Sequence, residues 1–108
     1  MPKPNQFYIW LLLDGFVPVK GTPVEVEGGF DIFAHRHPTT PHLWQTSEGT
    51  TGSFITAYHR TRKGAIQATH NWVAKYGVEF LQDRIATLIA KYGLSPRYAD
   101  AQEGEISA

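Results

Sequence analysis

An unbroken apolar run, Phe7 to Leu13, lies near the start of the chain and ends at Asp14-Gly15. Side chains on a strand alternate between two faces, so both faces of this run are apolar and both need cover. The Asp-Gly pair readily adopts the positive φ angles of a two-residue hairpin turn, which predicts a partner strand over Phe16 to Lys20. The first expected element is therefore a hairpin.

A second hairpin is predicted around Gly28-Gly29. A two-residue loop here would set apolar side chains opposite charged ones. A three-residue loop over 27–29 instead pairs Val24 with Ile32 and keeps apolar side chains on one face. We therefore expect the three-residue loop, followed by a strand over 30–37.

Two further strands are expected over 42–46 and 53–58, after which the period of the apolar positions changes to that of a helix. Thr61 is a suitable N-cap for a first helix that ends at Gly77. A second amphipathic stripe runs from Val78 to Gly93. The pattern leaves open whether the helices form a tight hairpin or a rod kinked between them.

Taken together, these elements predict an α+β fold, with an antiparallel β-meander of about five strands and a C-terminal pair of α-helices packed on one face. The length of 108 residues suits a single domain, expected over 1–98. Residues 99–108 contain Asp100, Glu103 and Glu105 and no basic residue, which predicts an acidic flexible tail.

The charge of the chain is balanced as a whole but uneven along its length. Setting aside the three acids of the tail leaves ten basic residues against seven acidic ones in the folded part, an excess of three. The absence of cysteine excludes disulfides, thiolate metal sites and a cysteine nucleophile. The apolar run is far shorter than the roughly 20 residues of a membrane helix, and we expect a cytoplasmic protein that does not enter membranes.

No catalytic motif is present. The Gly49–Gly52 segment lacks the spacing of a phosphate-binding loop, and neither Ser47 nor Ser53 lies in a nucleophile elbow. We therefore expect neither an enzyme nor a cofactor.

The histidines offer one possible metal site. His35 and His37 would share a strand face with Asp31, and His42 follows a proline-bounded turn that could bring it near. The same spacing is common among solvent-exposed histidines on strands. The sequence favours the solvent-exposed interpretation.

A basic cluster, Arg60, Arg62 and Lys63, lies where the first helix begins. Helix N-termini attract anions through their unpaired amides and the helix dipole. The cluster therefore predicts nucleic-acid or phosphate binding as an alternative function. A solvated corner between strand and helix is the simpler interpretation.

The aromatic residues carry the leading hypothesis. The helical stripes can cover one face of the first strand, but the sequence supplies no cover for the opposite face. An uncovered apolar patch on such a small protein indicates an interface with a second copy or another protein. We therefore expect a small non-enzymatic protein-binding or inhibitory module, with four candidate anchors: Tyr8, Trp10, Phe33 and Trp44.

The stretch from Trp44 to Ile66, with Glu48, Thr51-Gly52 and Thr61-Arg62-Lys63, resembles small proteins of phages and mobile elements. This group includes anti-CRISPR-type inhibitors. The resemblance implies a stoichiometric binder and an anti-defence role, and it assigns a function to no individual residue.

Overall fold

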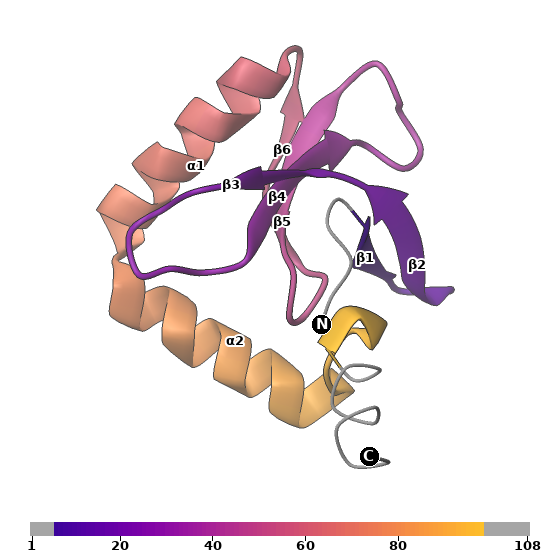
Figure 1. Ribbon diagram of the computed structural model, residues 1–108, viewed down its shortest axis with the longest axis vertical. Helices are drawn as coiled ribbons and strands as arrows, with labels where there is room; N and C mark the ends of the chain where they lie inside the picture. Colours follow the sequence, from indigo (N-terminus) through magenta and orange to yellow (C-terminus); the bar gives the residue numbers. More distant parts are fainter. Residues whose placement is uncertain (1–5, 99–108) are drawn as a thin grey trace.

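The computed structural model describes residues 6–98, which form six strands and two long helices (Figure 1). The predicted tail, 99–108, lies outside these residues. The strands form two antiparallel sheets, ordered β1-β2 and β3-β4-β5-β6. The elements are β1 (Gln6–Leu11), β2 (Gly15–Lys20), β3 (Thr22–Val24), β4 (Ile32–Arg36), β5 (Trp44–Glu48), β6 (Phe54–His59), α1 (Arg62–Tyr76) and α2 (Val78–Tyr92).

The α+β class, the antiparallel pairing and the C-terminal helices are confirmed, but the single meander is wrong. The chain leaves the first sheet and enters the second at Gly21, between β2 and β3. At this point the Phe7 and Phe33 rings stack with centroids 4.1 Å apart, so β1 packs on the face of β4 and does not pair with it. A Cβ at Gly21 would lie 2.7 Å from the Phe33 ring and 2.9 Å from the Phe7 ring. Only glycine fits where the chain crosses this stack.

The first hairpin differs from its predicted turn. Leu11 pairs with Gly15, so three residues, 12–14, form the turn in place of two. This register sets Ile9 opposite Val17, whereas the two-residue turn would set it opposite a lysine. Apolar burial on one face therefore overrides the Asp-Gly turn signal. This register leaves two apolar side chains in solvent at the tip of the hairpin, where Leu12 and Leu13 are 87% and 94% exposed.

The second hairpin has the predicted register, with Val24 opposite Ile32. Both helices also begin and end as predicted. The Thr61 Oγ1 atom accepts a hydrogen bond from the Gly64 amide at 2.9 Å, which caps α1. Gly77 separates α1 from α2 with a φ of 90°. Figure 1 shows that the helices form an open elbow there, so of the two alternatives the structure has the rod bent at Gly77 and not the tight hairpin.

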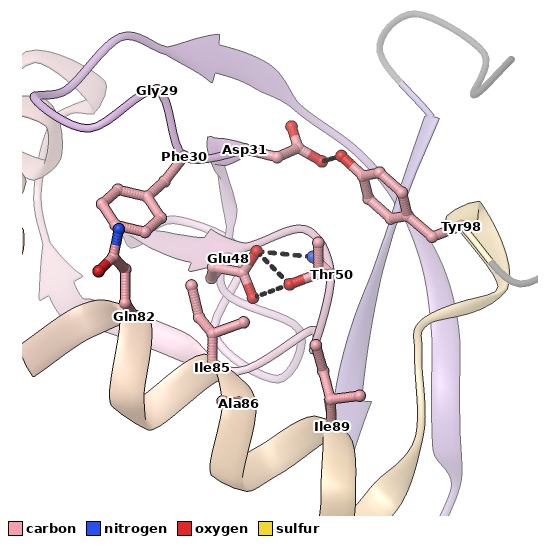
Figure 2. A pocket seen from close by; sticks show the side chains of 10 residues that line it. All are labelled: Gly29, Phe30, Asp31, Glu48, Thr50, Gln82, Ile85, Ala86, Ile89 and Tyr98. Carbon is pink, nitrogen blue, oxygen red and sulfur yellow. Dashed lines mark hydrogen bonds between the residues drawn. The ribbon is translucent and has the colours of Figure 1, made fainter. Parts of the chain in front are cut away.

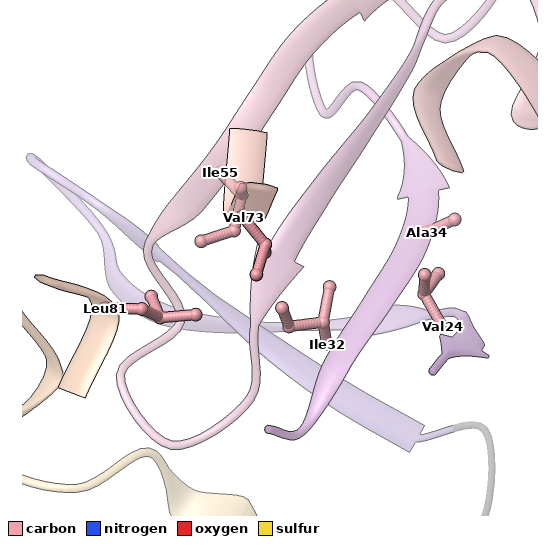
Figure 3. Close-up of a cluster of buried hydrophobic side chains, with 6 residues drawn as sticks. All are labelled: Val24, Ile32, Ala34, Ile55, Val73 and Leu81. Atoms are coloured by element: carbon pink, nitrogen blue, oxygen red, sulfur yellow. The ribbon is translucent and has the colours of Figure 1, made fainter. Parts of the chain in front are cut away.

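The helices cover one face of the four-stranded sheet. Val73 of α1 and Leu81 of α2 pack on the sheet through a cluster of buried side chains (Figure 3). A second cluster lies between the two sheets and contains Phe7, Ile9 and Phe33. The four-stranded sheet, and not the helices, therefore covers the first face of β1. The remaining members of the helix-side cluster are Val24, Ile32, Ala34 and Ile55.

The loop between β5 and β6 is held against β1. The Trp10 amide donates a hydrogen bond to the Gly52 carbonyl at 2.9 Å. Gly52 has a φ of 71°, and a Cβ there would lie 2.8 Å from the Trp10 nitrogen and 3.0 Å from the Ile9 carbonyl carbon. Both the backbone conformation and the close approach require glycine.

We predict that Gly52→Ala destabilises the protein far more than Gly29→Ala. Gly29 also has a positive φ, 69°, but a Cβ there would meet nothing within 4 Å. The control is therefore destabilised only through its backbone conformation, by about 1 kcal/mol, whereas Gly52→Ala adds a clash with β1 and costs about 3 kcal/mol in total. Urea unfolding measures both. Equal losses would show that the loop moves away from β1 without penalty.

Candidate functional site

Three strand ends and the start of α1 meet at one end of the four-stranded sheet. Arg36 ends β4, Trp44 begins β5, and His59 ends β6. The register sets Arg36 opposite Trp44 and Trp44 opposite His59. Because α1 begins at Arg62, the predicted basic cluster lies beside these residues.

Two arginines approach the Trp44 ring. The guanidinium carbon of Arg36 lies 4.3 Å from the ring centroid, and that of Arg62 lies 5.9 Å from it. Arg36 is also fixed by a hydrogen bond from its Nη1 to the Pro41 carbonyl at 3.3 Å. Each cation–π contact at an exposed site is worth about 0.5–1 kcal/mol. The half-buried indole thus holds two cations near each other in spite of their mutual repulsion.

A second aromatic pair lies at the same end. The His37 and Tyr58 rings stack with centroids 5.0 Å apart and an interplanar angle of 29°. The His37 Nδ1 atom accepts hydrogen bonds from the Thr39 and Thr40 amides at 3.3 and 3.2 Å, which fix the orientation of the ring. Alternation along the strand directs Arg36 and His37 to opposite faces. Cationic and aromatic groups therefore occur on both faces of this sheet end.

The charge around this end is strongly one-sided. Between Ile32 and Val78 the sequence contains a single acidic residue, Glu48, against five lysines and arginines. Glu48 is buried, 1% exposed, and it ends β5 whereas Trp44 begins that strand. Carboxylates that neighbour these cations in the sequence therefore do not cancel their positive electrostatic potential. Four of the five cations, Arg36, Arg60, Arg62 and Lys63, lie at this end, and the fifth, Lys75, lies in the last turn of α1.

The structure brings some predicted site residues together and separates others. Arg60, Arg62 and Lys63 are exposed, and Trp44 lies beside Arg62. Phe33 is fully buried against Phe7 and is not part of the surface. Of the four aromatic anchors, only Trp44 therefore lies with the basic cluster.

The second face of β1, for which the sequence supplied no cover, is covered by other side chains of the same chain. The Trp10 ring contacts Phe16 of β2 and Tyr92 of α2, with centroids 5.1 and 5.0 Å apart. Tyr8 and Trp10 are both partly buried. The sequence pattern contained no signal for this cover, because it depends on where α2 ends in space.

Two residues at this end of the sheet, Arg36 and Tyr58, were not predicted as site residues from the sequence. The proline-bounded turn between β4 and β5 could have indicated Arg36, since pairing across that turn sets it opposite Trp44. Nothing in the local sequence marks Tyr58, whose position depends on an irregularity in β6.

Within residues 6–98, the structure does not bring the candidate histidines together into a set of metal ligands. Among residues 6–98, no group of three or more histidine, cysteine, aspartate or glutamate side chains is placed to hold a metal ion. His35 is buried, and its Nδ1 donates to the Arg36 carbonyl while its Nε2 accepts from the Ser47 hydroxyl, both at 2.8 Å. His37 bonds to its own turn, and His42 is exposed. The expectation of a solvent-exposed histidine is therefore wrong for His35.

Burial lowers the pKa of the His35 imidazole from 6.5 to about 4, and the hydrogen bond to the Arg36 carbonyl only partly opposes this shift. The unfolded chain binds a proton at this residue below about pH 6.5, but the folded chain does so only below about pH 4. The contribution of neutral His35 to stability is thus fully present above pH 6.5 and is lost as the pH falls toward 4.

We predict that the stability advantage of the wild type over His35→Gln shrinks by about 3 kcal/mol between neutral pH and about pH 4. Glutamine does not titrate, so subtracting the two free energies of unfolding removes the carboxylates and the other histidines from the comparison. Urea unfolding at a series of pH values measures this difference. Parallel curves for the two proteins would contradict the prediction.

A pocket of about 390 Å³ lies between α2 and the loops of both hairpins in the four-stranded sheet (Figure 2). Its two carboxylates, Glu48 and Asp31, already accept hydrogen bonds from donors of the chain itself. Glu48 accepts hydrogen bonds from the amides of Thr50 and Thr51 at 2.7 and 3.0 Å and also from their hydroxyls. Asp31 accepts from the Tyr98 hydroxyl at 2.6 Å and pairs with Arg97 at 3.1 Å. These carboxylates organise loops, so we place the candidate site at the basic end of the sheet.

Comparisons with known proteins add no assignment, because no family model, curated protein or solved structure matches the chain. Within residues 6–98, neither helix has the length and apolar character needed to cross a membrane. The function must therefore be argued from the geometry of the basic end.

Proposed function

We propose that the protein binds nucleic acid through the end of the four-stranded sheet formed by Arg36, Trp44, Arg60, Arg62 and Lys63, which we call the basic end. One observation carries the proposal. Two guanidinium groups are held at one indole, 4.3 and 5.9 Å from its centroid, beside further exposed cations. Arginine and lysine side chains grouped with aromatic rings are typical of surfaces that contact phosphates and bases.

The arrangement suits a phosphate backbone. A guanidinium group offers a planar set of donors that matches two phosphate oxygens. Arg36 is already ordered by the Trp44 ring and the Pro41 carbonyl, so it loses less conformational entropy on binding than a free side chain would.

The start of α1 adds to this attraction. The first turn of α1 contains no acidic residue and begins with Arg62 and Lys63. Cations there oppose the helix dipole, which by itself destabilises the helix slightly. A bound phosphate would interact favourably with both the helix dipole and the cations. The cations in the first turn, which destabilise the helix of the free protein slightly, would therefore stabilise the complex.

We predict that Arg60→Gln/Lys63→Gln weakens binding to a labelled oligonucleotide of about 12 nucleotides and flattens its salt dependence. The slope of log K against log salt should fall by about 1 for each side chain that contacts a phosphate. Fluorescence anisotropy between about 50 and 200 mM salt measures this slope.

Lys75→Gln/Lys91→Gln is the matched control. It removes the same charge from exposed positions in the last turns of α1 and α2. Lys75 lies about 18 Å along the helix axis from Lys63. The control should keep nearly the whole salt slope. An unchanged slope in Arg60→Gln/Lys63→Gln, or an equal loss in both variants, would contradict binding at the basic end.

Protein binding is the second candidate function, as an inhibitory module of the kind carried by mobile elements. One observation favours it, since Leu12 and Leu13 are 87% and 94% exposed side by side at a turn. Adjacent exposed leucines are an energetic liability unless a second surface covers them.

For this second candidate we predict that the wild type forms a homodimer and that Leu12→Ser/Leu13→Ser is a monomer. The substitutions lie in a turn outside both core clusters, so the unfolding midpoint should change little. Light scattering over a range of concentrations measures the mass. A wild type that stays monomeric at high concentration would argue against self-association through this turn.

A further inference from the structure

β6 contains an extra residue at the basic end. Thr46 pairs with Thr56 and Trp44 pairs with His59, so Gln45 alone lies opposite two residues, Ala57 and Tyr58. This two-against-one arrangement is a β-bulge, a feature that redirects side chains and is frequent beside functional sites.

Tyr58 is strained by this bulge. Its φ is 66°, and no other non-glycine residue within 6–98 has a positive φ. A bulky side chain rarely adopts this left-handed conformation, because its Cβ approaches the following carbonyl group. The pairing of β6 with β5 must therefore impose it, and strain of this kind is concentrated at functional sites.

The bulge places a large aromatic ring in solvent. Tyr58 is 69% exposed, although tyrosine normally buries most of its ring. Its ring is not loose, because it stacks on His37, which is in turn fixed by the Thr39 and Thr40 amides. The result is an ordered and exposed aromatic surface.

The two aromatic groups of the basic end differ in what surrounds them. The Trp44 ring is approached by Arg36 and Arg62 and serves to hold cations. The Tyr58 ring is stacked on an imidazole, and Arg60 follows it by two positions in the sequence. Cations at one ring and an exposed ring on the opposite face of the same sheet end are the two components that a single nucleic-acid strand passing over this end requires, for its phosphates and for its bases.

We infer that Tyr58 stacks on an unpaired base, and hence that the ligand of the basic end is a single-stranded nucleic acid. This inference rests on the proposed function and adds the class of nucleic acid. Bases within a duplex already stack on one another, and their faces are inaccessible to a side chain at the surface. Every base has an aromatic face, so we expect little sequence preference.

The test compares two single strands of equal length and charge, one of thymidines and one of abasic sugars. The wild type should bind the thymidine strand about tenfold more tightly, since only that strand can stack. Tyr58→Asn should bind both strands with the affinity that the wild type has for the abasic strand. Asparagine tolerates a positive φ, so this variant removes the ring without adding strain.

Tyr58→Phe is the matched control and should keep the tenfold preference, because the ring and not the hydroxyl makes the contact. A uridine strand tests whether RNA is bound as tightly as DNA, and tight binding of either strand supports the inference. Thermal unfolding checks that both variants fold.

The outcomes separate this inference from the proposed function. Salt-dependent binding with equal affinity for the thymidine and abasic strands would overturn base stacking and leave phosphate binding intact. Tighter binding to a duplex than to a single strand, or wild-type preference in Tyr58→Asn, would overturn it in the same way. Absence of binding to every strand would overturn both proposals.

Discussion

The layered arrangement depends on the stacking of Phe7 on Phe33, two fully buried rings with centroids 4.1 Å apart. This contact sets the first hairpin on the face of the four-stranded sheet opposite the helices, so both faces of that sheet are covered (Figure 1). The Arg97 guanidinium lies 4.2 Å from the Phe7 ring centroid and pairs with Asp31, which ties the end of the described chain to the same layer. With the middle of both faces covered, the end of the sheet that holds Arg36, Trp44 and Tyr58 is a surface where ordered side chains can meet a ligand.

The features that the sequence predicted correctly are those that local signals determine. Thr61, Gly77 and Gly93 mark the helix limits because capping and positive φ act within a few residues. The register of the second hairpin follows from alternation over a short loop. The predicted turn of the first hairpin was wrong because a local turn preference competed with the burial of Ile9 and its neighbours on a distant sheet. Burial contributes more to stability than the turn preference does. The division into two sheets depends on the same distant contact, which no local pattern contains.

The candidate site likewise contains residues that the sequence predicted and residues that it did not. Arg60, Arg62 and Lys63 are adjacent in the sequence and were identified as a cluster, but their aromatic partners come from other strands. Trp44 was expected as an aromatic anchor at an apolar interface, and the structure also places two cations at its ring: Arg36 through the pairing of β4 with β5, and Arg62 from the start of α1. Tyr58 lies in a bulge of β6, where Gln45 of β5 faces two residues, and a tyrosine does not by itself favour the positive φ found there. His35 was misassigned because the sequence does not show which strand face receives the first hairpin.

A chain of zero formal charge can still attract a polyanion, since the Debye length at physiological salt is about 8 Å and only nearby charges count. Acids are absent from the sequence around the basic end except for Glu48, whose carboxylate is buried and bonded within its own loop. Two features of this end are unfavourable in the free protein: cations in the first turn of α1 and a left-handed tyrosine. Residues that destabilise the fold locally are expected at positions where function, rather than folding, determines the residue type. A ligand that carries phosphates and exposed bases would offset both, and a duplex or an apolar protein surface would offset at most one.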